Sequence, residues 1–439
     1  MIEQIYELYK TAYTVTTDSR TITPGCVFVA LKGEHFDGND FALKVAEDGV
    51  AACVIADRKD LPRHERLFVV DDSLKALQQL AHYHRQQLNT PIIGITGTNG
   101  KTTTKELVSA VLSKKYDIIF TQGNFNNQLG EPLTLLRIRP ETELAVVEMG
   151  ASHPGDIREL TDIGEPNYGI ITNIGRAHLE GFGGFEGVIR TKNEMYQHIA
   201  EHKGLLFVNS DNPLLMDLSR GMDKVTYGTA PTADVKGKLL SAAPYLSVDW
   251  NGYQINTQLV GDYNFENVMA AICVGTYFKV TASDIVDALS HYCPTNNRSQ
   301  VIETGRNRVV MDAYNANPTS MSHALNNFRN ICKEDNLLIL GDMRELGEES
   351  QKEHENIFNL VKDLGFKKVY LVGTEFSTLL KNTNYSSKVE TDNIDLSEYL
   401  VFPDVEALML YLQQHPVSGK DILVKGSNGI HLNKITDSL

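Results

Sequence analysis

The chain has no stretch long enough to cross a bilayer and no recognisable export signal. Its one extended uncharged run, Asn267–Phe278, is far shorter than the ~20 apolar residues of a membrane-spanning helix. The first ten residues, MIEQIYELYK, lack the basic start and apolar core of a secretory signal. No internal repeat or low-complexity tract is evident. These absences predict a cytoplasmic protein with no membrane partner.

Clustered basic residues are also missing. The formal net charge is -15, and Lys and Arg are scattered along the chain. Nucleic acid is therefore not expected as a partner, because phosphate backbones are bound by clustered Lys and Arg. A small phosphorylated ligand remains compatible with this charge, since one loop and one lysine suffice to bind it.

Cysteine is scarce and unpaired in sequence. The chain has five cysteines and no C-x-x-C pair: Cys26, Cys53, Cys273, Cys293 and Cys332. The spacing favours buried, reduced thiols, and a disulfide or metal role is the alternative.

What is present is the composition of ordinary globular domains, with 42% hydrophobic and 22% charged residues. A length of 439 residues exceeds one core and predicts three domains, at 1–88, 89–296 and 297–439. Strand-like apolar runs alternate with helical patterns, which predicts α/β domains with mostly parallel sheets. The prediction is a small N-terminal α/β domain, a central P-loop-type domain with a mostly parallel sheet, and a C-terminal Rossmann-like α/β domain.

The main strands are expected at Val27–Leu31, Ala52–Ala56, Leu67–Val70, Ile92–Ile95, Ile118–Thr121, Leu144–Glu148, Tyr168–Thr172, Leu205–Asn209, Arg308–Asp312, Leu337–Leu340, Val369–Val372 and Ile422–Val424. A helix is expected at Ser73–Leu88 and a β-hairpin near Leu246–Val260.

The stretch Pro91–Glu106, PIIGITGTNGKTTTKE, predicts a strand, a glycine-rich loop and a helix. This arrangement points backbone N–H groups and the positive end of a helix dipole at one spot, which suits nucleotide phosphates. The spacing is the short G-x-x-G-K-T, because Ile95 stands where the usual P-loop has its first glycine. The expected contacts are Gly97, Thr98, Asn99, Gly100, Lys101, Thr102 and Thr103. An ordinary glycine-rich turn is the alternative.

Other polar residues follow strand ends, where ligands bind in parallel α/β sheets. Glu148 closes a strand and is placed to hold magnesium opposite Lys101 and Thr102. His178 lies in the loop after another strand, and Lys192 lies in a helical stretch. By themselves, these two residues fit an ordinary hydrogen-bonded histidine and a solvated surface lysine.

Three further segments are candidates for ligand contacts. The loop from Thr121 to Thr134 is rich in amides and glycine, and is either a polar binding surface or a linker. Asn264 and Asn267 lie one helical turn apart and are suited to a base or ribose, or to helix capping. Asp18-Ser19-Arg20 fits a surface turn or a ligand contact.

Together these motifs resemble the Mur ligase family, the ATP-dependent amino-acid ligases of peptidoglycan precursor synthesis. The family motifs are G-T-N-G-K-T, the strand ending in Glu148, N-I-G-x-A-H ending in His178, Lys192, and N-x-x-N at Asn264 and Asn267. Four more stretches are similar to the members that ligate a dipeptide: Phe28–Gly38, Gly123–Thr134, Tyr314–Pro318 and Gly341–Gly347.

The resemblance implies an enzyme that adds D-alanyl-D-alanine to UDP-N-acetylmuramoyl-tripeptide through an acyl phosphate. It implies ATP and two magnesium ions as cofactors, held by Thr102, Glu148, His178 and a carbamylated Lys192. With Lys101, the last three would be catalytic. Arg298 and Asp312 would complete the ATP site from the third domain. Ser19, Arg20, Lys32 and Asp37 would bind the UDP end, Asn124 and Asn127 the sugar-peptide part, and Tyr314, Asn315, Lys425 and Ser427 the dipeptide. A monomer is expected.

Two positions depart from the family pattern. Tyr263 stands where histidine is expected and predicts a change in a packing or hydrogen-bond detail at the start of the nucleotide-side helix. Asn428 stands where arginine is expected after Lys425-Gly-Ser427, and an amide cannot bind a carboxylate as a guanidinium does. The rival functions are a relative that adds one amino acid, a folylpolyglutamate synthase, a nucleotide-binding scaffold without chemistry and a nucleic-acid-dependent ATPase.

Overall fold

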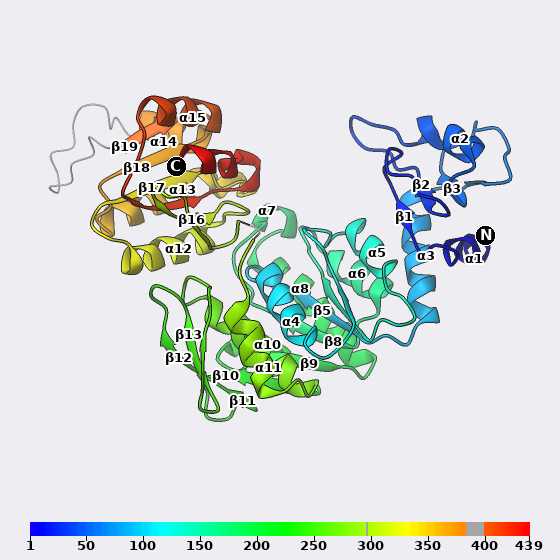
Figure 1. Cartoon of the computed structure of the whole chain (residues 1–439), viewed down its shortest axis with the longest axis horizontal. Coiled ribbons are helices and arrows are strands. Elements are labelled where there is room, and N and C mark those ends of the chain that lie inside the picture. The colour runs from blue at the N-terminus through cyan, green and yellow to red at the C-terminus, as the bar shows by residue number, and fades with distance from the viewer. Residues whose placement is uncertain (296, 383–398) are drawn as a thin grey trace.

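Three α/β units follow one another along the chain in the computed structural model, which describes residues 1–295, 297–382 and 399–439 (Figure 1). The predicted α/β class is confirmed by the three main sheets, which are largely or wholly parallel. The predicted boundaries after residues 88 and 296 stay a proposal, and Asn296 lies outside the described residues. No helix in the described part of the chain combines the length and apolar character needed to span a membrane.

The first unit contains a wholly parallel sheet in the order β1-β2-β3-β4. Its elements are α1 (Ile2–Tyr9), β1 (Val15–Thr16), β2 (Val27–Val29), α2 (Asn39–Asp48), β3 (Cys53–Ala56), β4 (Leu67–Val69) and α3 (Ser73–Gln87). The apolar runs of β2 and β3 are fully buried, as strands covered on both faces require. Helix α3 begins at Ser73 because the Asp72 carboxylate accepts a hydrogen bond from the Lys75 N–H at 3.0 Å.

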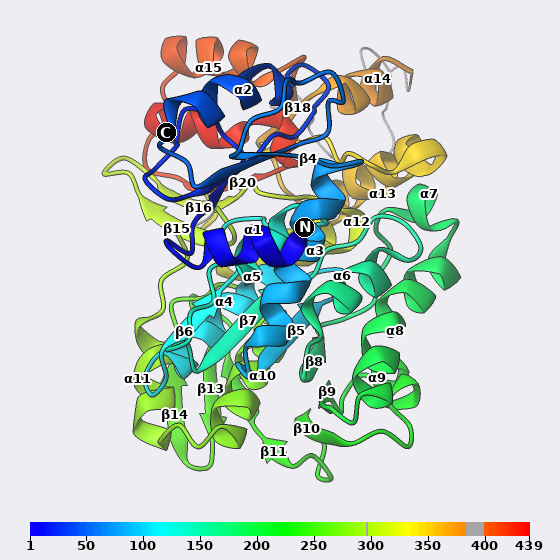
Figure 2. The same cartoon turned by 90° about the vertical axis from the view of Figure 1, so that its right-hand side faces the viewer.

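Helix α3 also packs against the second unit. Its His84 ring lies 2.9 Å from the carbonyl oxygen of Ile138, and the hydroxyl of Tyr9 on α1 donates to the Leu136 carbonyl at 2.6 Å. Leu77 and Leu80 belong to a hydrophobic core that includes residues of both units. Figure 2 shows α1 and α3 crossing in front of the central unit. The N-terminal unit therefore sits on a shared core rather than on a free linker.

The central unit is organised around a seven-stranded parallel sheet in the order β11-β10-β9-β8-β5-β7-β6. Its elements are β5 (Ile92–Thr96), α4 (Lys101–Leu112), β6 (Ile118–Phe120), α5 (Gly130–Leu135), β7 (Leu144–Glu148), α6 (Asp156–Gly164), β8 (Tyr168–Ile171), α7 (Leu179–Phe182), α8 (Phe185–Glu201), β9 (Leu205–Asn209), α9 (Pro213–Leu218), β10 (Lys224–Gly228), β11 (Val235–Lys236), α10 (Asn264–Tyr277) and α11 (Ala282–His291). β5 lies between β7 and β8, so the loops after these three strands meet at one edge.

A small antiparallel sheet extends the central unit. It contains β12 (Lys238–Ser241), β13 (Ser247–Trp250) and β14 (Tyr253–Asn256). β13 and β14 form the predicted hairpin, with Trp250 paired to Tyr253. The sequence predicts neither β12 nor β10 and the edge strand β11, whose residues lack a continuous apolar run.

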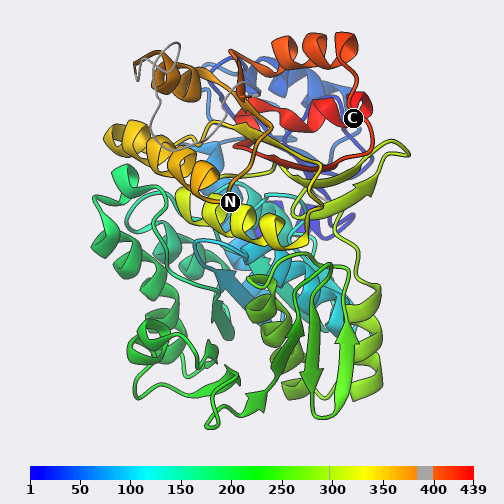
Figure 3. The ribbon, with the colours of Figure 1, turned by 90° about the vertical axis from the view of Figure 1, so that its left-hand side faces the viewer.

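The third unit has a six-stranded sheet in the order β15-β16-β20-β17-β18-β19, with only β15 antiparallel to its neighbour. Its elements are β15 (Gln300–Glu303), β16 (Arg308–Asp312), α12 (Pro318–Ile331), β17 (Asn336–Gly341), η1 (Gly347–Glu349), α13 (Ser350–Asp363), β18 (Val369–Val372), α14 (Thr374–Asn382), β19 (Tyr399–Phe402), α15 (Val405–Gln414), β20 (Asp421–Lys425), η2 (Asn428–Ile430) and η3 (Leu432–Ser438). Helix α12 lies on the side that faces the central unit (Figures 1 and 3).

Candidate active site

The glycine-rich loop after β5 has a backbone that only glycine accommodates well. Gly97 has φ +143° and Gly100 has φ +79°, and α4 starts at the next residue, Lys101. A Cβ at Gly97 would lie 2.0 Å from the Thr172 hydroxyl oxygen, and one at Gly100 would lie 2.6 Å from the Asn267 side-chain oxygen. The loop therefore packs against the strand on one side and α10 on the other.

The loop is held from the neighbouring strand end. The Thr98 N–H donates to the Asn173 carbonyl at 2.9 Å, and the Asn99 N–H donates to the Asn173 side-chain oxygen at 2.9 Å. The Gly175 N–H donates to the Thr98 hydroxyl at 2.9 Å. These contacts restrain the loop, and such preorganisation lowers the free-energy cost of binding an anion.

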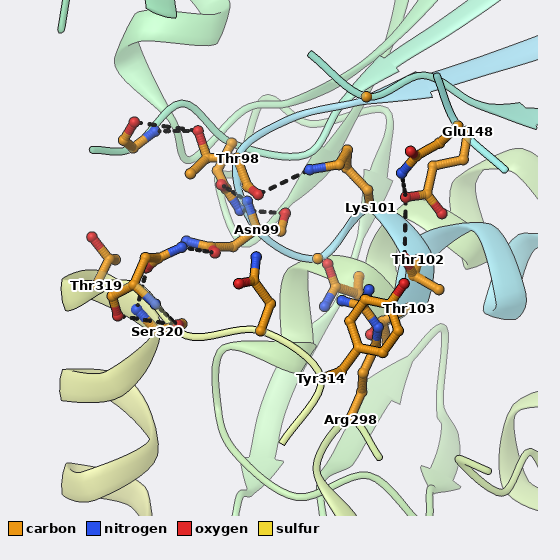
Figure 4. Close-up of a pocket in the computed structure, with 18 of the residues that line it drawn as sticks. Thr98, Asn99, Lys101, Thr102, Thr103, Glu148, Arg298, Tyr314, Thr319 and Ser320 are labelled. Carbon is orange, nitrogen blue, oxygen red and sulfur yellow. Dashed lines mark hydrogen bonds between the residues drawn. The ribbon is translucent and has the colours of Figure 1, made fainter. Parts of the chain in front are cut away.

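The Lys101 ammonium lies over this loop. It donates to the Gly97 and Thr98 carbonyls at 2.8 and 3.0 Å (Figure 4). Burial lowers the pKa of Lys101 to about 8, an effect partly offset by Glu148 and reinforced by Arg298. Both of its partners are uncharged, so the described structure supplies no anion in direct contact with this cation. An arriving phosphate would supply that missing charge.

Glu148, at the end of β7, is 1% exposed and only partly satisfied. Its Oε1 accepts hydrogen bonds from the Thr102 hydroxyl at 3.1 Å and from the Asn126 amide at 2.8 Å (Figure 4). Its Oε2 is buried and has no hydrogen-bond partner among the described residues. A buried carboxylate oxygen without a donor, beside a threonine hydroxyl, fits the oxygen ligands that magnesium prefers.

His178 joins this site to the third unit. Its Nδ1 lies 2.8 Å from Oε2 of Glu345, and its backbone has φ +51° at the start of α7. Hydrogen bonding to His178 lowers the pKa of Glu345. The loop after β17 thus reaches the loop after β8.

Lys192 is buried on α8, so the interpretation as a solvated surface lysine is wrong. It is 2% exposed, and its ammonium nitrogen lies 5.7 Å from the centre of the Phe182 ring. The pKa of Lys192 is lowered well below its ordinary value, mainly by burial and next by the nearby positive charge of Lys101. No group of three or more His, Cys, Asp or Glu side chains within the described residues is arranged to hold a metal. As an amine, Lys192 is no magnesium ligand, because magnesium prefers oxygen ligands.

A cavity of about 600 Å³ opens between the nucleotide loop and the third unit. It is lined by sixteen of the predicted site residues: Thr98, Asn99, Gly100, Lys101, Thr102, Thr103, Asn127, Glu148, His178, Asn264, Asn267, Arg298, Asp312, Tyr314, Asn315 and Lys425. The lining residues come from both the central and the third unit. The volume suits a ligand of nucleotide size.

The two asparagines of α10 are buried beside the nucleotide loop, at 3% and 5% exposure. The Asn264 amide donates to the Val260 carbonyl at 2.8 Å, and the Asn267 amide donates to the Asn264 oxygen at 2.9 Å. Neither side chain caps the helix, so the capping interpretation is wrong. The pair holds the end of α10 against Thr104, whose hydroxyl donates to Asn267 at 3.0 Å.

The third unit contributes a compact charged group. The Lys425 ammonium lies 2.6 Å from the Asp312 carboxylate and donates to the Asn315 carbonyl at 3.3 Å. The Arg298 guanidinium carbon lies 3.9 Å from the centre of the Tyr314 ring (Figure 4). Strand ends of two sheets thus present cations to one cavity.

Models of known protein families match the sequence along most of the chain. The "Mur ligase family, catalytic domain" matches residues 11–85, the "Mur ligase middle domain" residues 95–275, and the "Mur ligase, glutamate ligase domain" residues 297–428. A UDP-N-acetylmuramoyl-tripeptide--D-alanyl-D-alanine ligase from Bacillus subtilis is 35% identical over 434 residues, covering 97% of this chain and 92% of the relative. The chain belongs to the Mur ligase family.

Other Mur ligases support the membership. The enzyme of the same name from Escherichia coli is 31% identical, with 97% of this chain and 93% of the relative covered. MurF from Acinetobacter baumannii superposes with a TM-score of 0.81 at 30% identity, covering 96% of this chain and 92% of that one. MurF from Thermotoga maritima, solved in complex with ADP, superposes with a TM-score of 0.80 at 27% identity, covering 97% of both chains. The predicted family and three-domain fold class are confirmed.

Several predicted residues of this Mur ligase do not line the cavity. Four of them lie in the first unit: Ser19, Arg20, Lys32 and Asp37. The other four are Gly97, Asn124, Lys192 and Ser427. Gly97 belongs to the glycine-rich loop and accepts a hydrogen bond from Lys101 through its carbonyl, and Lys192 is buried on α8 near the Phe182 ring. The Ser427 hydroxyl accepts the Arg344 N–H at 2.9 Å. Asn124 is exposed in the amide-rich loop.

The first unit has its own polar surface. Arg20 is 87% exposed at the side chain and pairs with Asp18 at 2.7 Å, and hydrogen bonds from Arg20 lower the pKa of Asp18 to about 2. Lys32 and Asp37 pair across an isolated β-bridge. The pKa of Asp37 is lowered first by a hydrogen bond from Asn39. The predicted turn at Asp18 is present and leaves Arg20 open to solvent.

Three contacts of this site are not predicted from the sequence. Asn126 bonds Glu148, the Asn317 amide donates to the Asn99 oxygen at 2.8 Å, and Glu345 pairs with His178. All three come from the amide-rich loop or the third-unit motifs, but several asparagines and acidic residues stand close together there. Sequence spacing does not tell which of them faces the neighbouring unit.

The departure at Asn428 has a structural counterpart. Asn428 begins η2, and a Cβ at the next residue, Gly429, would lie 3.3 Å from Nε of Arg344. A guanidinium therefore stands beside this loop, although it comes from the loop after β17.

Proposed function

We propose that this Mur ligase joins D-alanyl-D-alanine to UDP-N-acetylmuramoyl-tripeptide, using ATP, during peptidoglycan precursor synthesis. The 35% identity to a relative of that name over 97% of the chain supports the substrates. The observation that carries the chemistry is the cavity shared by Lys101, Glu148 and the third unit. It has a phosphate-binding loop on one wall and an independent set of polar loops on the other.

The mechanism follows from what an amide bond requires. A carboxylate is a poor electrophile, so the C-terminal carboxylate of the tripeptide is first converted by ATP into an acyl phosphate. The dipeptide amine then attacks the acyl carbon, a tetrahedral intermediate forms, and phosphate leaves. Lys101 and the loop N–H groups stabilise the negative charge that develops on the oxygens in both steps. No covalent bond to the protein is needed.

Two magnesium ions complete the proposed site and would offset charge on the transferred phosphoryl group. Thr102 and Glu148 would hold one, and His178 and carbamylated Lys192 the other. The buried, unpartnered Oε2 of Glu148 supports the first position. His178 would have to exchange its contact with Glu345 for the metal.

Magnesium is expected to bind weakly to the chain alone and well with ATP. At this site the described residues present one buried, unpartnered carboxylate oxygen, Oε2 of Glu148, and no preformed cluster. Magnesium usually relies on substrate phosphates for the rest of its shell. Calorimetric titration with MgCl2 should therefore show a dissociation constant of about millimolar or weaker without nucleotide. Micromolar binding to the nucleotide-free chain would contradict this arrangement.

The remaining predicted residues divide among the substrates. Asn264, Asn267, Arg298 and Asp312 would hold the nucleotide. The UDP end would be bound on the first unit by Ser19, Arg20, Lys32 and Asp37. The sugar-peptide part would be bound by Asn124 and Asn127. Tyr314, Asn315, Lys425 and Ser427 would lie near the dipeptide. We propose that the enzyme acts as a cytoplasmic monomer with domains at 1–88, 89–296 and 297–439, and without nucleic-acid or membrane partners.

The acceptor panel tests this function against its rivals. With ATP and UDP-N-acetylmuramoyl-tripeptide, phosphate release is expected with D-alanyl-D-alanine and not with D-alanine, other single amino acids, or folate with glutamate. A folylpolyglutamate synthase from Thermotoga maritima shares the fold at 14% identity, with a TM-score of 0.59, so that substrate pair belongs in the panel. Turnover with a single amino acid would move the chain to another subclass. Nucleotide binding without acceptor-dependent phosphate release would favour a scaffold.

A further inference from the structure

The segment that joins the central and third units has an unusual backbone around Arg298. Asn297 and Ser299 have φ +56° and +50°, so two non-glycine residues in the left-handed region flank this arginine. Such conformations persist only where surrounding contacts hold them. Arg298 lines the cavity, and its Nε is buried without a hydrogen-bond partner among the described residues.

The contacts that hold Ser299 come from both units. Its hydroxyl lies 2.7 Å from the hydroxyl of Tyr263, the residue before α10 in the central unit. Its N–H donates to Oδ1 of Asp312, at the end of β16 in the third unit, at 3.2 Å. Asp312 in turn pairs with Lys425. Ser299 is therefore tied to the central unit through one side-chain contact and to the third unit through its backbone.

Tyr263 also faces the third unit directly. The centre of its ring lies 6.0 Å from that of His323 on α12, and both rings line the cavity. Burial raises the pKa of Tyr263, which keeps the phenol protonated and able to donate a hydrogen bond. A histidine at this position is shorter than tyrosine, so it would not reach the Ser299 hydroxyl from the same backbone.

We propose that Tyr263 is a positioning residue for ATP use: its hydrogen bond to Ser299 holds the linker so that Arg298 stays in the cavity between the central and third units. Arg298 then stacks on Tyr314 and presents its cation from a fixed backbone. This role rests on the proposed function, because it assigns Arg298 to the ATP side of the cavity. Tyr263 acts through Ser299 and need not touch the reacting atoms.

The hydrogen bond can be tested apart from the packing of the ring. Tyr263→Phe removes only the hydroxyl, and Ser299→Ala removes its partner. Each variant is expected to raise KM for ATP, and to weaken binding of a fluorescent ADP analogue, by roughly two- to tenfold, the effect of one neutral hydrogen bond. The double variant should be no worse than the worse single one, because both changes remove the same contact. KM for the UDP-tripeptide should not change.

Controls separate this role from general stability. Tyr253→Phe, on the exposed strand β14 away from the cavity, should leave ADP binding and KM for ATP unchanged. Tyr263→His should weaken ADP binding as Tyr263→Phe does. Additive effects in the double variant, or unchanged ADP binding in both single variants, would overturn the proposal. Because ADP binding is measured without acceptor, this result stands even if the acceptor panel shows no ligation and the proposed function fails.

Discussion

Replacing Lys101 with alanine is expected to lower kcat for phosphate release by about 10²–10³-fold while leaving the fold intact. The ammonium lies over the glycine-rich loop, and it donates only to the Gly97 and Thr98 carbonyls in the described structure. Losing one preorganised donor to a developing oxyanion costs about this much in other enzymes. Steady-state kinetics with saturating substrates measure the effect.

The same substitution is not expected to lower the stability of the folded chain. The pKa of Lys101 is lowered from 10.5 to about 8 in the folded chain, so the folded state binds the proton less tightly than the unfolded state. This opposes folding most fully below pH 8, and the cost is relieved as pH rises from 8 toward 10.5. Lys101→Ala should therefore have a Tm at pH 7 no lower than that of the unchanged chain, and any advantage should shrink above pH 8.

Lys115 provides a matched control for this experiment. It follows the other end of α4, and its ammonium also donates to two backbone carbonyls, those of Phe278 and Lys279, at 3.1 and 3.0 Å. Lys115→Ala removes the same kind of contact away from the cavity and should leave kcat unchanged. Near-normal turnover in Lys101→Ala would sink the assignment of this loop to phosphate binding.

The sequence predicts the sheets well where strands are apolar and the loops well where glycine is required. The buried runs of β5, β7 and β8 are recognisable because both faces of a parallel sheet exclude water. The Gly97 and Gly100 positions follow from the loop geometry. Strand β10, with the sequence KVTYG, is missed because it has no continuous apolar run.

The contacts between units are harder to predict. Glu345 and Asn317 meet His178 and Asn99 only because two sheets face each other, and sequence periodicity describes one element at a time. The prediction that Lys192 is a solvated surface lysine is wrong, although the local sequence pattern indicates its burial. It shares a helical face with three buried residues of α8, namely Val188, Met195 and Ile199, at the i, i+4, i+7 and i+11 spacing of an amphipathic helix.

A lysine on an apolar helix face is the basis of the second large prediction. Burial and the nearby Lys101 lower the pKa of Lys192, which favours the neutral amine. A neutral amine attacks CO2, forming a C–N bond and releasing one proton, and the product is a carbamate anion. The carbamate replaces a cation that repels Lys101 with an anion that attracts it. Burial therefore favours the neutral amine that reacts with CO2, while attraction to Lys101 and to a bound magnesium ion would offset the cost of burying the carbamate anion.

Lys192→Met is expected to lower kcat by roughly 10²–10³-fold, because a lost metal ligand removes several kcal/mol of charge stabilisation. The carbamate itself should be visible without turnover: in the presence of magnesium, ADP and ¹³C-labelled bicarbonate, ¹³C NMR should show a carbamate resonance that Lys192→Met lacks.

Lys105→Met is the matched control. Lys105 is also buried, but its ammonium forms an ion pair with Glu106 at 2.7 Å. This ion pair stabilises the ammonium over the neutral amine that reacts with CO2. The resonance should survive in that variant. Two results would contradict the prediction: full activity in CO2-depleted buffer, or a carbamate signal that persists in Lys192→Met. Either result would mean that Lys192 has a packing role and is not a metal ligand.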